Sequence, residues 1–174
     1  MRGFSSFLIL LILGAGAALA HDPKSTAPRL SVRFELGHGK ALAIDYLSLH
    51  WNPRAYRNIL ASERMLRYKN ESLFGNLGTA RFDVPVVIDG NRLEAGEYEL
   101  GFLLEPDGSW RLRLRGQKGR AILKTRAEAA SLRSDYLGIV LIPNPPNAVL
   151  LEAACGPHQT RHRIEVPFLS QHHE

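Results

Sequence analysis

The chain has 174 residues, and 22 Lys and Arg against 17 Asp and Glu give it a formal net charge of +5. Its single Cys excludes a disulfide within the chain. The mild basic excess suits an acidic partner, but zinc spacings, Gly-aromatic runs and basic amphipathic helices are not found, so we expect no nucleic-acid partner.

The N-terminal stretch has the features of an export signal. Arg2 precedes an apolar run over residues 7–13, and the run leads to Ala18-Leu19-Ala20. A basic start, a short apolar run and A-x-A spacing are typical of a secretory signal peptide. The run is too short for a transmembrane helix, so we expect no stable membrane span after cleavage. We therefore predict a signal peptide over residues 1–20 and an exported, periplasmic or secreted, single domain over residues 21–174.

Short runs of alternating apolar residues recur along the rest of the chain, separated by Gly, Pro, Asn and Asp. Many short strands at this spacing indicate an all-β architecture. We predict a mainly β fold, an antiparallel β-sandwich with one or two short helices. The expected strands cover residues 30–36, 41–49, 80–88, 97–104, 110–115, 120–125, 137–142, 148–155 and 161–168.

Two segments have helical features. Asn52 is a good N-cap and Pro53 suits the first helical position, and apolar residues at helical spacing extend this helix to Leu66. Thr125 and Glu128 form a T-x-x-E capping box ahead of an Ala-rich stretch, which predicts a second, short helix.

Two turns define the register of three central strands. The sequence Glu-Pro-Asp-Gly at 105–108 predicts a turn that pairs Leu104 with Trp110. A second turn at 116–119 continues the same apolar face and pairs Arg111 with Lys124. The two hairpins agree on which face is apolar, and this agreement predicts a meander with one core face.

The opposite face of these hairpins is basic. Like charges on neighbouring strands repel unless other groups offset them. One hypothesis is therefore an anion-binding surface, and the alternative is a solvated sheet face with salt bridges. The residues concerned are Arg111, Arg113, Arg115, Arg120 and Lys124.

The segment IDGNRLEAGEYELGF, followed by Trp110, resembles the core of the domain of unknown function 2911 family. Upstream, Asp45-Tyr46 resembles the end of an earlier strand of that family, whereas Leu73-Phe74 replaces its Trp-Arg. The resemblance implies an exported bacterial protein of mainly β structure, and it implies no particular activity. The residues that match the family pattern are Gly90, Leu93, Ala95, Gly96, Tyr98 and Leu100.

Familiar catalytic motifs such as G-x-S-x-G, H-E-x-x-H and the Walker loop do not occur. Cys155 lies in the apolar stretch LLEAAC, which favours a buried and inert thiol. Two alternatives are a thiol–imidazole pair with His158 and a disulfide to another chain.

His21 becomes the N-terminal residue if cleavage follows Ala20. Its α-amine and imidazole can then chelate one Cu(II) ion together, with a further His as ligand. The alternative is a His that stands at a frayed end by chance. The further ligand would come from His38, His50, His158 or His162.

We expect a noncatalytic, exported binding or interaction domain of the bacterial envelope. Its partner would be an envelope protein, a glycan or an anionic lipid. Two other hypotheses are a copper-binding protein that uses His21 and a hydrolase with an unrecognised site. Copper is the only cofactor that any of these hypotheses requires.

Overall fold

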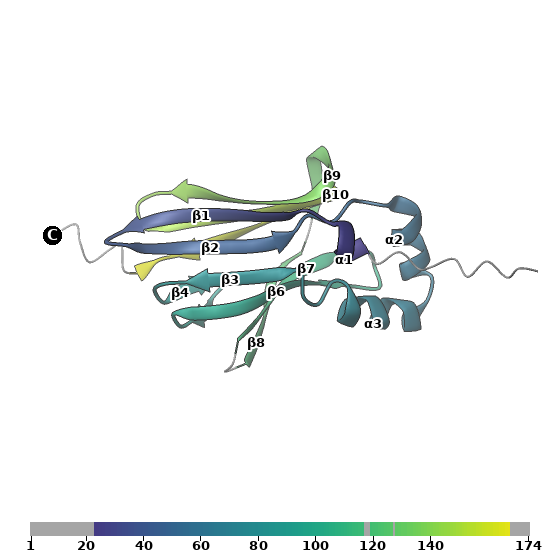
Figure 1. The fold of residues 1–174 in the computed structure, drawn as a ribbon, viewed down its shortest axis with the longest axis horizontal. Helices are drawn as coiled ribbons and strands as arrows, with labels where there is room; N and C mark the ends of the chain where they lie inside the picture. Colours follow the sequence, from purple (N-terminus) through teal and green to yellow (C-terminus); the bar gives the residue numbers. More distant parts are fainter. Residues whose placement is uncertain (1–22, 117–118, 127, 168–174) are drawn as a thin grey trace, which may run out of the picture.

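The computed structural model describes residues 23–116, 119–126 and 128–167, and it confirms the mainly β fold (Figure 1). The helices of this part are α1 (Pro23–Thr26), α2 (Pro53–Leu60) and α3 (Glu63–Ser72). Its strands are β1 (Arg29–Gly37), β2 (Lys40–Leu47), β3 (Gly78–Phe82), β4 (Val86–Ile88), β5 (Asn91–Leu93), β6 (Gly96–Leu104), β7 (Trp110–Gly116), β8 (Gly119–Arg126), β9 (Glu128–Asn144) and β10 (Ala148–Glu165).

The strands form two antiparallel sheets that enclose one apolar core. One sheet has the order β1-β2-β3-β6-β7-β8 and the other has the order β5-β4-β10-β9. Alternate residues point inward in strands such as β2, where Leu42, Ile44 and Tyr46 are all buried. Helices α2 and α3 lie together beyond one end of the strands (Figure 1). The predicted β-sandwich is confirmed.

The structure confirms the first hairpin and most of the second. Leu104 faces Trp110, and Arg113 faces Ile122. The predicted pair of Arg111 with Lys124 is wrong, because a register shift between positions 111 and 113 places Arg111 opposite Arg126. A bulge of this kind inserts extra residues on one strand, and the turn sequence gives no sign of it.

The helix predicted from Thr125 and Glu128 is also wrong. Thr125 lies near the end of β8, and Glu128 begins β9, where it faces Gln159 of β10. Neighbouring strands supply partners for the backbone on both sides of this point, and this pairing outweighs the local preference for a helical cap.

The other predicted helix is confirmed at its start but is divided in two. Asn52 caps α2, and its Oδ1 accepts hydrogen bonds from the backbone N–H of Arg54 and Ala55. Helix α2 ends at Leu60, and Ser62 caps α3 by accepting a bond from Met65 N–H at 3.3 Å. A serine with N-cap geometry two residues after a helix starts a new helix.

Strand β10 folds back on itself. The backbone N–H of Val166 donates to Asn147 O at 2.9 Å, so the two ends of this long strand lie side by side. Gly156 has φ +60° and precedes Pro157, which places the bend there. The two halves correspond to the separate strands expected at 148–155 and 161–168. The bend itself lies against Trp51.

Candidate functional site

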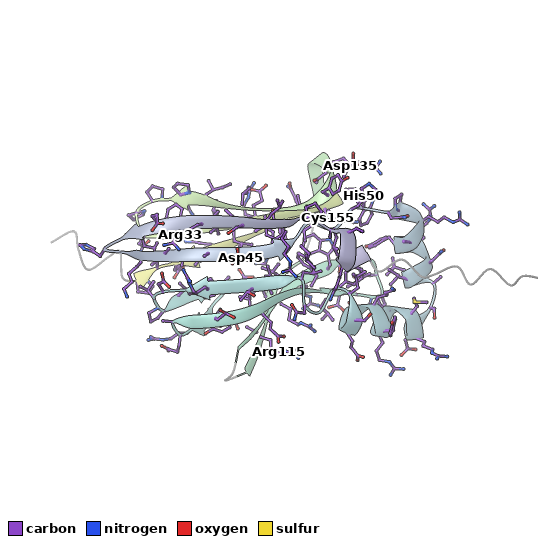
Figure 2. The ribbon with its side chains drawn as sticks, in the orientation of Figure 1. Arg33, Asp45, His50, Arg115, Asp135 and Cys155 are labelled. Atoms are coloured by element: carbon purple, nitrogen blue, oxygen red, sulfur yellow. The ribbon has the colours of Figure 1, made fainter. Side chains whose placement is uncertain are left out.

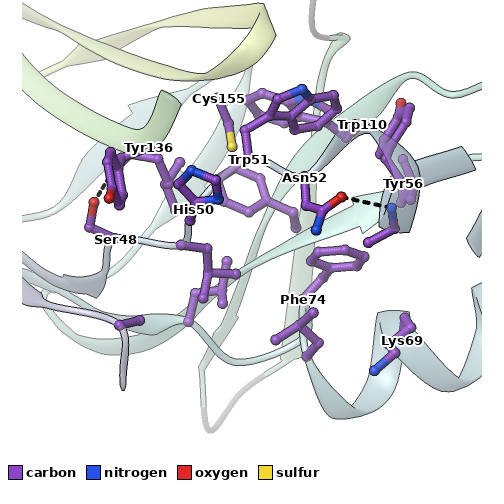
Figure 3. Close-up of a pocket in the computed structure, with 18 of the residues that line it drawn as sticks. Ser48, His50, Trp51, Asn52, Tyr56, Lys69, Phe74, Trp110, Tyr136 and Cys155 are labelled. Atoms are coloured by element: carbon purple, nitrogen blue, oxygen red, sulfur yellow. Dashed lines mark hydrogen bonds between the residues drawn. The ribbon is translucent and has the colours of Figure 1, made fainter. Parts of the chain in front are cut away.

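A pocket of about 730 Å³ lies between the two sheets at the helical end of the molecule (Figure 3). Elements α1, α2, α3, β6, β7, β9 and β10 contribute to it, as do the segments that follow α1, β2 and α3. Its aliphatic walls are Leu49, Ile59, Leu73, Leu77, Leu104 and Leu137. Its aromatic walls are Trp51, Tyr56, Phe74, Phe102, Trp110 and Tyr136. Exposed residues at its rim include Pro28, His50, Asn52 and Ala55.

The segment after β2 builds one side of the pocket by binding to the second sheet. Trp51 N–H donates to Asp135 O, and Leu137 N–H donates to Leu49 O, both at 2.8 Å. Ser48 Oγ donates to Leu137 O at 2.8 Å. These bonds hold the segment across the edge of β9. Figure 2 shows His50, Asp135 and Cys155 together at the end of the strands nearest the helices.

Trp51 is the centre of an aromatic cluster in the wall. Its ring centroid lies 4.6 Å from that of Tyr56 and 5.8 Å from that of His158. A methyl group at Gly156 would overlap the indole ring, so only glycine lets the bend of β10 approach this closely. The bend therefore packs against Trp51, which lines the pocket together with Cys155 just before the bend.

Two side chains fix the helices over the pocket. Asn70 of α3 donates from Nδ2 to Leu104 O at 2.8 Å and accepts from Leu104 N–H at 2.9 Å. Tyr56 of α2 donates from its hydroxyl to Gly108 O in the β6–β7 turn. Burial raises the pKa of Tyr56, so its hydroxyl stays protonated and remains a donor at neutral pH. The pocket is thus held by hydrogen bonds to the strand ends.

Most polar groups of the wall already have partners within the protein. The side chains of Ser48, Asn52 and Tyr56 form hydrogen bonds to backbone groups of the chain. Lys69 differs, because its Nζ lies 5.4 Å from the ring centroid of the neighbouring Tyr68 and no carboxylate pairs with it among the described residues. Lys69 and His50 are therefore the wall groups best able to meet a polar or acidic part of a ligand.

Cys155 is half-buried in the pocket wall, not fully buried as expected. Burial raises the pKa of its thiol to about 11. The thiol is therefore protonated at neutral pH, and a protonated thiol is a poor nucleophile. Burial also lowers the pKa of His158. The thiol–imidazole hypothesis gains no support from these two shifts.

Three arginines of the predicted basic face bind other parts of the chain. Arg111 pairs with Glu105 at 3.2 Å, and Arg115 pairs with Glu99. Arg113 donates to Gly75 O in the loop that follows α3. These contacts are of the kind expected for a solvated sheet face with salt bridges. Anion binding by this face stays a prediction. The side chains of Arg120 and Lys124 lie outside the described residues.

A different set of arginines has no such partner. Arg54 and Arg57 on α2, and Arg64 and Arg67 on α3, are exposed, and no carboxylate of the described residues lies within ion-pair distance of them. These four arginines are not among the residues predicted from the sequence to form a site. In the sequence, this group can be recognised as two pairs of arginines, each three residues apart, within the predicted helix.

A buried network joins β10 to the turn after β4. His162 Nδ1 lies 2.9 Å from Asp89 Oδ2, and His162 Nε2 lies 3.0 Å from Thr160 Oγ1. The order carboxylate, imidazole, hydroxyl matches that of a hydrolase triad. However, His162 is 0% exposed and Thr160 is 2% exposed, so no substrate can reach the hydroxyl. The network satisfies buried polar groups and holds the turn in place.

His21 lies outside the described residues. Within residues 23–116, 119–126 and 128–167, no group of three or more His, Cys, Asp and Glu could hold a metal ion. No helix in these ranges has both the length and the apolar character that crossing a membrane needs.

Comparisons of the chain with protein-family models, curated proteins and solved structures found no match. The resemblance to the domain of unknown function 2911 family stays a prediction.

Proposed function

We propose that this chain is an exported, noncatalytic binding domain that holds a small apolar or amphipathic molecule in the pocket. One observation carries the proposal: a cavity of about 730 Å³ with aliphatic and aromatic walls. Ligand sites in proteins typically have roughly 300–1,000 Å³ and walls of this kind with few polar groups.

The distribution of polar groups indicates how the ligand would be oriented. The inner walls are apolar, whereas His50 and Lys69 are less buried and stand among the few polar groups that border the cavity. An amphipathic ligand would place its apolar part against Phe102 and Trp110 and its polar part near these groups. A negative polar group would gain further from the Lys69 ammonium.

The chemistry of the wall favours binding over catalysis. The Cys155 thiol is protonated at neutral pH. The hydroxyl of Thr160 is buried away from the pocket lining. Neither group therefore offers an activated nucleophile to a bound molecule.

Intrinsic fluorescence provides a direct test, because the chain has 2 Trp residues and both line the pocket. We expect the neutral apolar dye N-phenyl-1-naphthylamine to bind with saturation and to quench the emission of Trp51 and Trp110. The dye carries no charge, so this signal reports on the pocket and not on the basic surface of the protein.

Ala55→Phe is the informative variant. Ala55 lies at the rim, and a phenyl ring there would occupy the entrance. We expect dye affinity to fall at least about tenfold. Ala61→Phe is the matched control, because Ala61 is exposed at the end of α2 and does not line the pocket. Equal affinities in the two variants, or quenching without saturation, would contradict the proposal.

A further inference from the structure

The outer sides of α2 and α3, which we call the helical cap, combine unpaired cations with exposed apolar side chains. With about 3.6 residues per turn, positions 64, 65, 67 and 68 share one side of α3, opposite the buried Leu66. Met65 is 42% exposed and Tyr68 is 57% exposed, and Arg64 and Arg67 flank them.

Helix α2 has the same division. Arg54 and Arg57 lie on one side, whereas Ala55, Tyr56 and Ile59 lie on the other and line the pocket. Helix α2 therefore presents arginines outward and apolar groups to the pocket, whereas α3 contributes Lys69 to the pocket lining. Each helix is about 10 Å thick, so a surface that contacts the helical cap would lie one helix layer from the pocket.

The arginines of the helical cap form no close ion pair within the described part of the chain. Within the described part of the chain, no carboxylate lies within 4.0 Å of any of the four, whereas many exposed arginines on the strands have such partners, Arg29 and Arg133 excepted. Arg33, for example, pairs with Glu35 at 2.5 Å, and Arg161 pairs with Glu152 at 2.9 Å. The positive charge of the helical cap is therefore available to an external anionic partner.

We infer that the helical cap docks the protein on an anionic lipid surface. Arginines that lie beside exposed apolar side chains fit the boundary between headgroups and acyl chains, where the guanidinium meets phosphate and the apolar part is buried. A soluble polyanion would bind the arginines but leave Met65 and Tyr68 uncovered. The inference deepens the proposed function, because a ligand of the pocket would be soluble in such a membrane.

Vesicle sedimentation tests this docking without reference to the pocket. We expect the protein to bind phosphatidylcholine vesicles that contain phosphatidylglycerol, not to bind phosphatidylcholine alone, and to be released by added salt. Arg64→Glu combined with Arg67→Glu should weaken binding at least about tenfold, since each basic residue near the surface adds substantially to the attraction.

The matched control reverses two charges elsewhere. Lys40 begins β2 at the end of the molecule away from the helices (Figure 1), and Arg92 lies on β5. Lys40→Glu combined with Arg92→Glu changes the net charge equally and should retain nearly full binding. Equal loss in both double variants would overturn the inference, because it would show a dependence on net charge alone.

Two further variants separate this inference from the proposed function. Ala55→Phe should lose dye binding but keep vesicle binding. Tyr68→Ser combined with Met65→Ser should weaken vesicle binding and leave binding to heparin unchanged. Binding to heparin without binding to anionic vesicles would overturn the inference and leave the pocket proposal intact.

Discussion

Exposed arginines on the strands and exposed arginines on the helical cap differ in their ion pairing. Many exposed arginines on the strands pair with a carboxylate, which for Arg92 and Arg163 lies two residues along, although Arg133 on β9 has none within 4.0 Å among the described residues. Arginines on the helical cap, such as Arg57 and Arg64, have none among the described residues. Residues two apart share one face of a strand, so an Arg-x-Glu pattern neutralises itself there. Most of the exposed arginines that lack an ion pair among the described residues therefore lie on the helical cap.

The same contrast extends to buried groups. In the body of the sandwich, His162 and Thr160 are buried and hydrogen-bonded to each other, and His162 also contacts Asp89. At the helical end, an apolar cavity separates the sheets. The apolar cavity therefore lies at the helical end, whereas this buried hydrogen-bond network lies in the body of the sandwich. We expect variants in the body to alter stability and variants at the helical end to alter binding.

The largest effect is expected where the two regions meet. Gly156 has φ +60°, and a side chain there would overlap the Trp51 ring. Gly156→Ala should lower the free energy of unfolding by about 2–5 kcal/mol, from backbone strain and overpacking together. Urea denaturation followed by circular dichroism measures this change.

Gly138→Ala is the control for that measurement. Gly138 lies on β9 in the same sheet, and a Cβ there meets nothing within 4 Å. Its substitution should change stability by no more than about 0.5 kcal/mol. If both variants were equally stable, the close approach of Trp51 to the bend would not be a packing constraint.

A smaller effect is expected from the buried His162. Burial lowers its pKa below the ordinary value of 6.5, although Asp89 opposes this shift. The unfolded chain therefore takes up the proton first as the pH falls. Stability should be full above about pH 6.5 and should decline below it, since the unfolded state then binds more protons.

His162→Gln tests the origin of that decline. Glutamine keeps an amide donor for Asp89 but does not titrate. The variant should be less stable than the wild type by about 1–3 kcal/mol at pH 7 and should lose stability less steeply between pH 7 and pH 5. His158→Gln should remove a smaller part of the slope, because His158 is also shifted downward by burial but is less enclosed. An unchanged slope in His162→Gln would contradict the assignment.

Patterns local to the chain predicted the parts of the fold that depend on local chemistry. The turn at 105–108 predicted the pairing of Leu104 with Trp110, and Asn52 predicted the start of α2. The helix predicted at Thr125 is wrong for the opposite reason, because pairing with a distant strand determines the structure of that segment. A capping box favours a helix by only about a kilocalorie per mole, and a strand ladder outweighs it.

The candidate site could not be predicted in the same way. Its walls come from segments as distant as Ala27 and Cys155, which the fold alone brings together. The bend at Gly156 was visible only as a Gly-Pro pair, and its contact with Trp51 depends on tertiary packing. The unpaired arginines could have been found, since helical spacing shows which residues share the outer side of each helix.

The smallest effect concerns the paired arginines themselves. Arg115 and Glu99 face each other on β7 and β6, and both side chains are about half exposed. Such pairs contribute about 0.2–1 kcal/mol because solvent screens them. A double-mutant cycle with Arg115→Ala and Glu99→Ala should give a coupling energy in that range, whereas Arg64→Ala should leave stability unchanged within about 0.5 kcal/mol. A cost for Arg64→Ala as large as that for Arg115→Ala would mean that Arg64 has a structural role, and the contrast between strands and helical cap would fail.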